Sequence, residues 1–150
     1  MIVGVHVFER LFREIAGLDV DKNDLKRLSD LVGKKLNDLL IVGVRNASYN
    51  ARDLIMEPDL PLTKGFLESL QQFRALESHS EIELQPILAH LAQYPPLERE
   101  LSANVEAMLP DLVGALIFIL ARTMKVVDPQ VVNPDTETWE RVAAILDLTL

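Results

Sequence analysis

The sequence predicts an all-α protein, and three observations lead to this class. Leucine, a strong helix former, is the commonest residue, while aromatic residues make up 5% of the chain. Apolar residues recur at the helical spacing i, i+3, i+4, i+7 in several separate stretches. Proline, glycine and aspartate stand where these stretches begin and end. A length of 150 residues with 49% apolar residues is enough for one globular core.

An internal repeat divides the chain into two copies. An offset of 76 residues, without a gap, aligns the apolar positions of one half with those of the other. Ile55–Asp59 then falls on Val131–Asp135, so that two Pro-Asp pairs coincide. We expect one compact domain that contains both copies and a polar linker. The domain is 1–150, the repeats are about 5–76 and 84–150, and the linker is 77–83.

Each copy predicts a short, a long and a second short helix. The first short helix spans about His6–Ala16 and ends near Gly17, a typical residue just beyond a helix. Asp21 or Asn23 caps the long helix, which continues to about Asn50. This helix is too long to bury its faces alone, so it must cross a partner.

The third helix of the first copy is expected to begin at Pro58, which suits the first helical position, and to continue to about Leu76. Pro110 lies inside the second long helix and should kink it. Our hypothesis is that Gly43 or Gly114 lets the two long helices cross closely. The helices of the second copy are expected at about Leu84–Gln93, Leu101–Val127 and Thr136–Leu148.

Composition and charge exclude several classes of protein. The chain has no cysteine, which excludes thiol catalysis, disulfides and cysteine-ligated metals. The net charge is −8: residues 1–75 balance at zero, and residues 76–150 carry all of it, with four basic and twelve acidic residues. The longest apolar run, Leu112–Ala121, is ten residues, whereas a membrane span needs about 17–25. We therefore expect a cytoplasmic protein without a membrane segment.

The short–long–short pattern resembles the histone fold. Glu9–Arg13 is similar to the acidic-Arg-Leu-x-Arg stretch on the first helix of archaeal histones. The whole chain resembles a bacterial family of tandem histone folds of about this length. The resemblance implies two histone folds paired within one chain as an intramolecular pseudo-dimer.

The resemblance also implies one structural ion pair. Arg52 and Asp59 are seven residues apart, as in the family's Arg-x-Thr-x-x-x-x-Asp motif, where the arginine holds the second loop against the third helix. Leu54 stands at the threonine position and is a departure from the motif. In the second copy Asp135 repeats the aspartate, but Asp128 replaces the arginine, so the pair is not expected there.

Histone folds bind duplex DNA through basic residues on paired loops and first helices. Here Asp19, Asp53 and Met56 stand at loop positions where DNA-binding members carry basic residues. The remaining basic residues lie on the first helix and at the start of the second, and they are the candidate nucleic-acid contacts. These are Arg10, Arg13, Lys22, Lys26 and Arg27.

The sequence offers little for catalysis or metal binding. His6, His79 and His90 are scattered without a matched ligand at metal-site spacing. No glycine-rich loop follows a predicted strand, so nucleotide-binding motifs are absent. Trp139 is expected to be a core anchor. We predict no catalytic residue, no metal and no cofactor.

These observations favour a non-enzymatic protein-interaction or dimerisation scaffold, with a protein partner or self-association. The alternative is a nucleoid-associated protein that binds DNA weakly through the basic residues of the first repeat. An enzyme whose site is assembled only by folding is the least favoured hypothesis.

Overall fold

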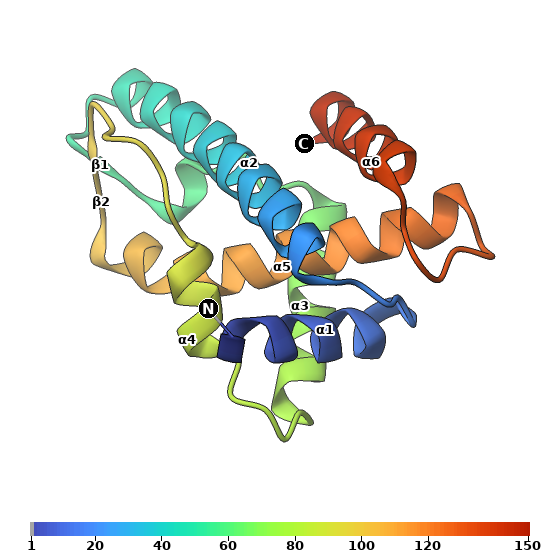
Figure 1. Ribbon diagram of the computed structural model, residues 1–150. Coiled ribbons are helices and arrows are strands. Elements are labelled where there is room, and N and C mark those ends of the chain that lie inside the picture. Colours follow the sequence, from blue (N-terminus) through green and yellow to red (C-terminus); the bar gives the residue numbers. More distant parts are fainter. Residues whose placement is uncertain (1) are drawn as a thin grey trace.

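The computed structural model describes the backbone of residues 2–150 and the side chains from residue 4 onward. Over these residues the chain is 71% helical, with six α-helices and two strands of two residues each, which confirms the all-α class (Figure 1). The elements are α1 (Ile2–Ala16), α2 (Lys22–Tyr49), β1 (Leu54–Ile55), η1 (Glu57–Asp59), α3 (Lys64–Ser78), α4 (Gln85–Leu91), β2 (Glu100–Leu101), α5 (Ala103–Val127) and α6 (Thr136–Thr149).

The start of α2 is fixed by a reciprocal cap. Of the two residues proposed for this cap, Asp21 provides it: its carboxylate accepts hydrogen bonds from the backbone N–H groups of Asn23 and Asp24, at 2.9 and 3.1 Å. The Asp24 carboxylate accepts the Asp21 N–H in return, at 3.0 Å. Gly17 ends α1 with a φ of 64°, in the left-handed region that glycine adopts without a Cβ clash.

The third helix begins later than predicted. Pro58 and Asp59 lie in the single 3₁₀ turn η1, and α3 starts only after Thr63, whose hydroxyl accepts the Phe66 N–H at 3.1 Å. Pro61 explains the delay, because a residue before proline avoids the α region and Leu60 is extended, with a ψ of 136°. A proline suits the start of a 3₁₀ turn as well as that of an α-helix, so Pro58 alone did not distinguish the two.

The second half has the same order of helices but a longer first loop. Helix α4 has 7 residues where α1 has 15, and residues 92–102 separate α4 from α5. Ser102 caps α5 through its hydroxyl, which accepts the Val105 N–H at 3.2 Å. The caps of the two long helices, Asp21 and Ser102, are therefore 81 residues apart (102 − 21), so the gapless offset of 76 is wrong for this part of the repeat.

Helix α5 is the centre of the molecule. It packs against α1, α2, α3, α4 and α6, and it crosses α2 in the middle of the fold (Figure 1). Its hydropathy and length would suffice for a membrane span, alone among the described helices, but 56% of the apolar window is buried within the protein. The helix continues through Pro110. It is the core helix of a globular fold, and the buried apolar side chains of both halves form one cluster around it.

The two glycines proposed for the helix crossing have different neighbours. A Cβ on Gly114 would lie 2.2 Å from the ring of Phe73, which belongs to α3. A Cβ on Gly43 would lie 2.9 Å from Ile55 and 3.1 Å from Leu60, in the segment that follows α2. The nearest atoms to both positions thus belong to other segments than the opposite long helix. The glycines instead admit α3 and the β1–η1 segment close to the long helices.

Candidate functional site

The two halves meet through paired loops at opposite ends of the molecule. At one end β1 pairs with β2 in parallel, with Leu54 opposite Glu100 and Ile55 opposite Leu101. At the other end the Asp19 N–H donates to the Val132 carbonyl at 2.7 Å. In both places the loop after one long helix lies beside the loop before the other. Of the candidate nucleic-acid contacts, Arg13 and Arg27 lie beside the second of these loop pairs.

Arg52 and Asp59 lie together at the β1 end. The two guanidinium Nη atoms donate to the two carboxylate oxygens, with 2.6 Å between Nη2 and Oδ1. Asp59 is buried and also accepts the Met56 N–H at 2.8 Å. The arginine contact holds the pKa of Asp59 below its usual range. The resemblance had implied that this pair holds the loop after α2 against the third helix. Because α3 begins only at Lys64, the pair instead ties that loop to turn η1.

The second half closes the equivalent loop differently. Asp135 caps α6, and its carboxylate accepts both the backbone N–H and the hydroxyl of Thr138, each at 2.9 Å. These bonds lower the pKa of Asp135. The Lys125 ammonium donates to the Val131 carbonyl at 2.5 Å and holds the loop against α5. Sequence reasoning did not find this lysine, because its acceptor is a backbone carbonyl, which leaves no pattern in the sequence.

The candidate nucleic-acid contacts do not form one basic surface. On α1, Arg13 pairs with Asp19 at 3.2 Å, and Arg10 lies 4.0 Å from Glu14. On α2, Arg27 donates to the Thr136 hydroxyl at 2.7 Å and so faces α6. Lys22 and Lys26 are exposed near the start of α2.

Both loop pairs carry acidic side chains. Near the Asp19–Val132 contact, a hollow of about 370 Å³ is lined by Asp21, Asp24 and Asp135 together with Arg27. At the other end, Arg52 and Arg99 are partly exposed, and several exposed residues are acidic. The acidic residues include Asp53, Glu57, Glu98 and Glu100.

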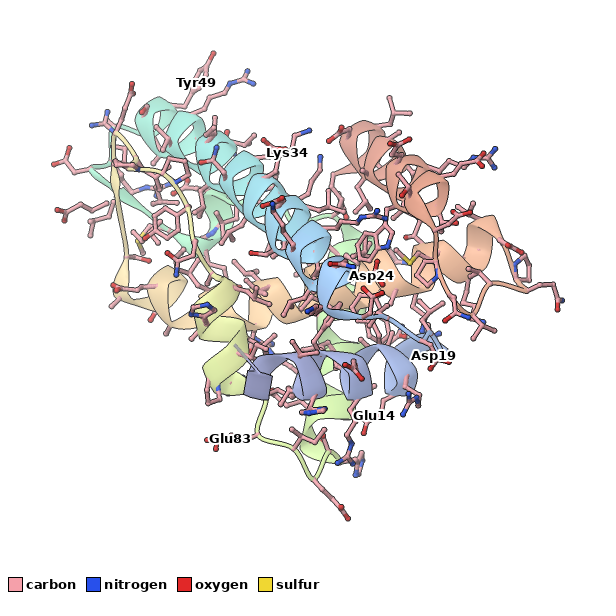
Figure 2. All side chains as sticks on the ribbon, viewed as in Figure 1. Glu14, Asp19, Asp24, Lys34, Tyr49 and Glu83 are labelled. Atoms are coloured by element: carbon pink, nitrogen blue, oxygen red, sulfur yellow. The ribbon has the colours of Figure 1, made fainter. Side chains whose placement is uncertain are left out.

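A buried acid and a buried indole lie close together where the start of α6 lies beside the start of α2. Asp24 is 8% exposed, and burial raises its pKa (Figure 2). Trp139 is buried as predicted, with its ring 6.3 Å from that of Phe12. The indole N–H of Trp139 lies near the Asp24 carboxylate and favours its charged form. The N–H does not meet the geometry of a hydrogen bond with Asp24, and it is buried without another acceptor. This contact could not be foreseen from two residues so far apart in the sequence.

Two lysines of α2 fasten the end of α6. Lys35 is 3% exposed, and its ammonium lies 2.5 Å from Asp147 and 3.4 Å from Asp38. Lys34 is exposed and lies 3.2 Å from the same aspartate, Asp147 (Figure 2). Both contacts lower the pKa of Asp147, the Lys35 contact most. The signal that could have revealed Lys35 is its place in the apolar stripe, between Val32 and Leu36.

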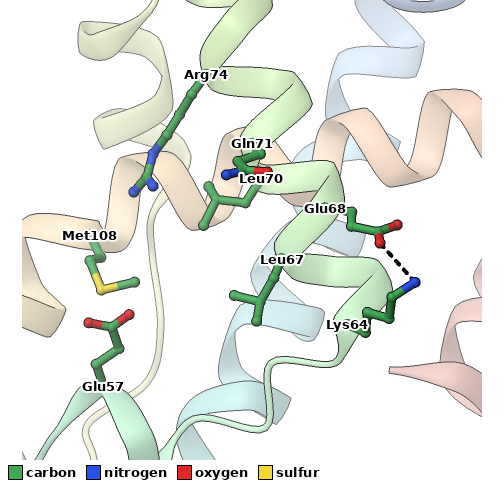
Figure 3. A pocket seen from close by; sticks show the side chains of 8 residues that line it. All are labelled: Glu57, Lys64, Leu67, Glu68, Leu70, Gln71, Arg74 and Met108. Atoms are coloured by element: carbon green, nitrogen blue, oxygen red, sulfur yellow. Dashed lines mark ion pairs between the residues drawn. The ribbon is translucent and has the colours of Figure 1, made fainter.

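A hollow lies along α3, and we call it the α3 groove (Figure 3). Its volume is about 700 Å³, and Leu67, Leu70 and Met108 provide its apolar lining. A second hollow of about 390 Å³, the α6 groove, lies between α2 and α6 and includes Trp139 and Arg27. Sequence analysis did not anticipate either groove.

The three histidines do not come together. His6, His79 and His90 are all exposed, and His79 follows the end of α3. Within the described part of the chain, no three acidic or histidine side chains are placed to hold a metal ion. The serines likewise form no hydrogen bond with a histidine among the described contacts.

Residues 8–147 match a family that is described as "Domain of unknown function (DUF1931)". The chain belongs to the DUF1931 family. An Aquifex aeolicus (strain VF5) relative named an uncharacterized protein is 31% identical, over 78% of this chain and 74% of the relative.

Two crystal structures resemble this DUF1931 member. A Thermus thermophilus protein is 53% identical, with a TM-score of 0.85 and 97% of both chains covered. A protein from Aquifex aeolicus is 24% identical, with a TM-score of 0.82 over 98% of this chain and 95% of that one. The first supports both the family assignment and the fold, and the second supports the fold.

Proposed function

We propose that this DUF1931 protein is a non-enzymatic interaction scaffold, made of two histone-like halves that pair within one chain. The observation that carries the proposal is the reciprocal loop contact. The loop after α2 pairs with the loop before α5, and the loop after α5 contacts the loop before α2. Helix lengths of 15, 28 and 15 residues, followed by 7, 25 and 14, agree with two such halves.

The charge of the loop pairs favours protein over nucleic acid as the partner. Acidic residues stand at both ends, and Arg13 and Arg27 are engaged by Asp19 and Thr136. An exposed acidic surface with a net charge of −8 for the chain repels a polyanion. In this proposal the protein acts in the cytoplasm and binds a protein partner, without a cofactor or a catalytic residue.

Titration of a labelled DNA duplex separates this proposal from its rival. We expect no binding at low salt, and the same result for the double variant Lys22→Glu/Arg27→Glu. Micromolar binding that weakens steeply with salt, and that the double variant loses, would instead assign the protein to the nucleoid. In-cell cross-linking with mass spectrometry then tests the scaffold, which must recover the same protein neighbour in independent preparations.

A further inference from the structure

The α3 and α6 grooves are equivalent positions in the two halves. Leu67 and Trp139 are each the fourth residue after a helix cap, Thr63 for α3 and Asp135 for α6. Across each groove, Met108 and Arg27 are each the sixth residue after the cap of a long helix. Each groove thus lies between the third helix of one half and the start of the long helix of the other.

The two grooves differ in what fills them. In the α6 groove the chain supplies its own anchor, because Trp139 is 5% exposed and buries a large indole against the core. In the α3 groove the equivalent residue is Leu67, which is 45% exposed. The α3 groove is correspondingly larger, at about 700 Å³ against 390 Å³. The α3 groove is lined by apolar side chains but by no aromatic one, whereas Trp139 lines the α6 groove.

The walls of the α3 groove carry charges of both signs. Figure 3 shows Met108 between the Arg74 guanidinium and the Glu57 carboxylate, with Leu67 and Leu70 facing them from α3. Arg74 uses its Nε to bind Asp111 at 3.0 Å, which leaves its two terminal nitrogens for another acceptor. Methionine is flexible and polarizable, so its side chain adapts to an aromatic ring.

From these observations we propose that the α3 groove binds a peptide segment of a partner protein. An aromatic side chain of that segment packs on Leu67, Leu70 and Met108, with an acidic residue near Arg74 and a basic residue near Glu57. The open side of the groove favours a peptide over a small molecule, since small-molecule pockets bury most of the ligand surface. The inference rests on the proposed scaffold function, for which it names the surface and the partner's chemistry.

Selection from a displayed library of random 12-residue peptides, with the full chain as the target, tests this assignment. We expect enriched peptides to share one aromatic residue flanked by an acidic and a basic residue. In Leu67→Trp an indole takes up part of the α3 groove, at the position where Trp139 lines the α6 groove. The affinity of a synthetic enriched peptide should fall at least about tenfold in this variant, because central aromatic anchors dominate such interfaces. Leu67→Glu should have the same effect if the indole disturbs folding.

Charge-reversal variants provide the matched control. Glu57→Lys should lower the affinity for the peptide about fivefold or more. Glu140→Lys makes the same charge reversal in the α6 groove and should leave this affinity unchanged. Failure of the library to enrich any peptide, or equal binding by Leu67→Trp, would overturn the assignment. A concentration-dependent mass in light scattering that Leu67→Trp abolishes would also overturn it, because the occupant would then be a second copy. The duplex titration and the cross-linking still decide the scaffold function in each of these cases.

Discussion

At the scale of single residues, Asp24 differs in its electrostatics from the other buried or bonded carboxylates. Burial raises its pKa, and the nearby Asp21 carboxylate adds to this, while Arg27 and the bond from the Asp21 N–H act in the opposite direction. A raised pKa in the folded state means that folding favours the protonated acid. The contribution of Asp24 to stability is therefore full at low pH and is lost as the pH rises through its folded-state pKa.

The variant Asp24→Asn removes this dependence while its amide oxygen can still accept the Asp21 N–H. Relative to the wild type, its melting temperature should rise as the pH increases from about 3.5 to 6. Asp59→Asn is the matched control of opposite sign, because the pKa of Asp59 is lowered and its stabilisation is lost in acid. Thermal unfolding at several pH values measures both. A constant difference between Asp24→Asn and the wild type would contradict the expectation.

Two adjacent lysines offer a second comparison at this scale. Lys35→Ala leaves the end of α6 without its buried cation, and it also removes the packed methylene groups of the lysine. We expect the free energy of unfolding to fall by about 2 kcal/mol, because the buried methylene groups leave a cavity, while Asp147 is half-exposed and keeps Lys34. Lys34→Ala removes an exposed cation from the same aspartate and should cost about 0.5 kcal/mol or less. Urea titrations measure the free energy of unfolding of both variants. An equal loss in Lys35→Ala and Lys34→Ala would show that the burial of Lys35 does not determine its contribution to stability.

At the scale of elements, α3 packs closely on α5 at Gly114. In Gly114→Ala the added Cβ would overlap the fully buried ring of Phe73, at 2.2 Å. The strain should exceed the gain of about 1 kcal/mol in helix propensity, with a net loss of about 2 kcal/mol or more. Gly65→Ala is the control, because nothing lies within 4 Å of its added Cβ, and we expect it to be neutral or slightly stabilising. If Gly114→Ala raised the melting temperature, the contact would not be tight in solution.

The elements also show which boundaries the sequence could predict. Asp21 identified the start of α2 because a capping side chain acts on its own neighbouring N–H groups, which is a local interaction. The start of α3 depends on Pro61, because Pro58 suits the start of a 3₁₀ turn as well as that of an α-helix. The register of α5 depended on the length of the loop at residues 92–102, and a gapless offset could not include an insertion.

The candidate sites divide along the same line. The contact between Arg52 and Asp59 was predicted from the resemblance to the family motif, and it lies within one short turn-containing segment. Lys35, Asp24 and the two grooves depend on contacts between helices of different halves. Such contacts require the packing of α2, α5 and α6, which periodicity alone does not determine.

At the scale of the whole molecule, the two halves share one core. The Phe73 ring of the first half packs on Gly114 of the second, and Lys35 of the first binds Asp147 of the second. We expect a single cooperative transition in urea. The fluorescence of Trp139, the only tryptophan, reports on the second half, and the helical circular dichroism reports on both. The two curves should coincide, and separate midpoints would show that the halves unfold independently.

The short connection between the halves, from the end of α3 at Ser78 to the start of α4 at Gln85, has a kinetic consequence. A short tether gives its two ends an effective concentration in the millimolar range, so the halves meet at a rate that does not depend on protein abundance. If the two halves were separate subunits, they would dissociate on dilution and could exchange partners. The tether prevents both events, so each half always has the same partner and the two can carry different surfaces, one acidic and one neutral.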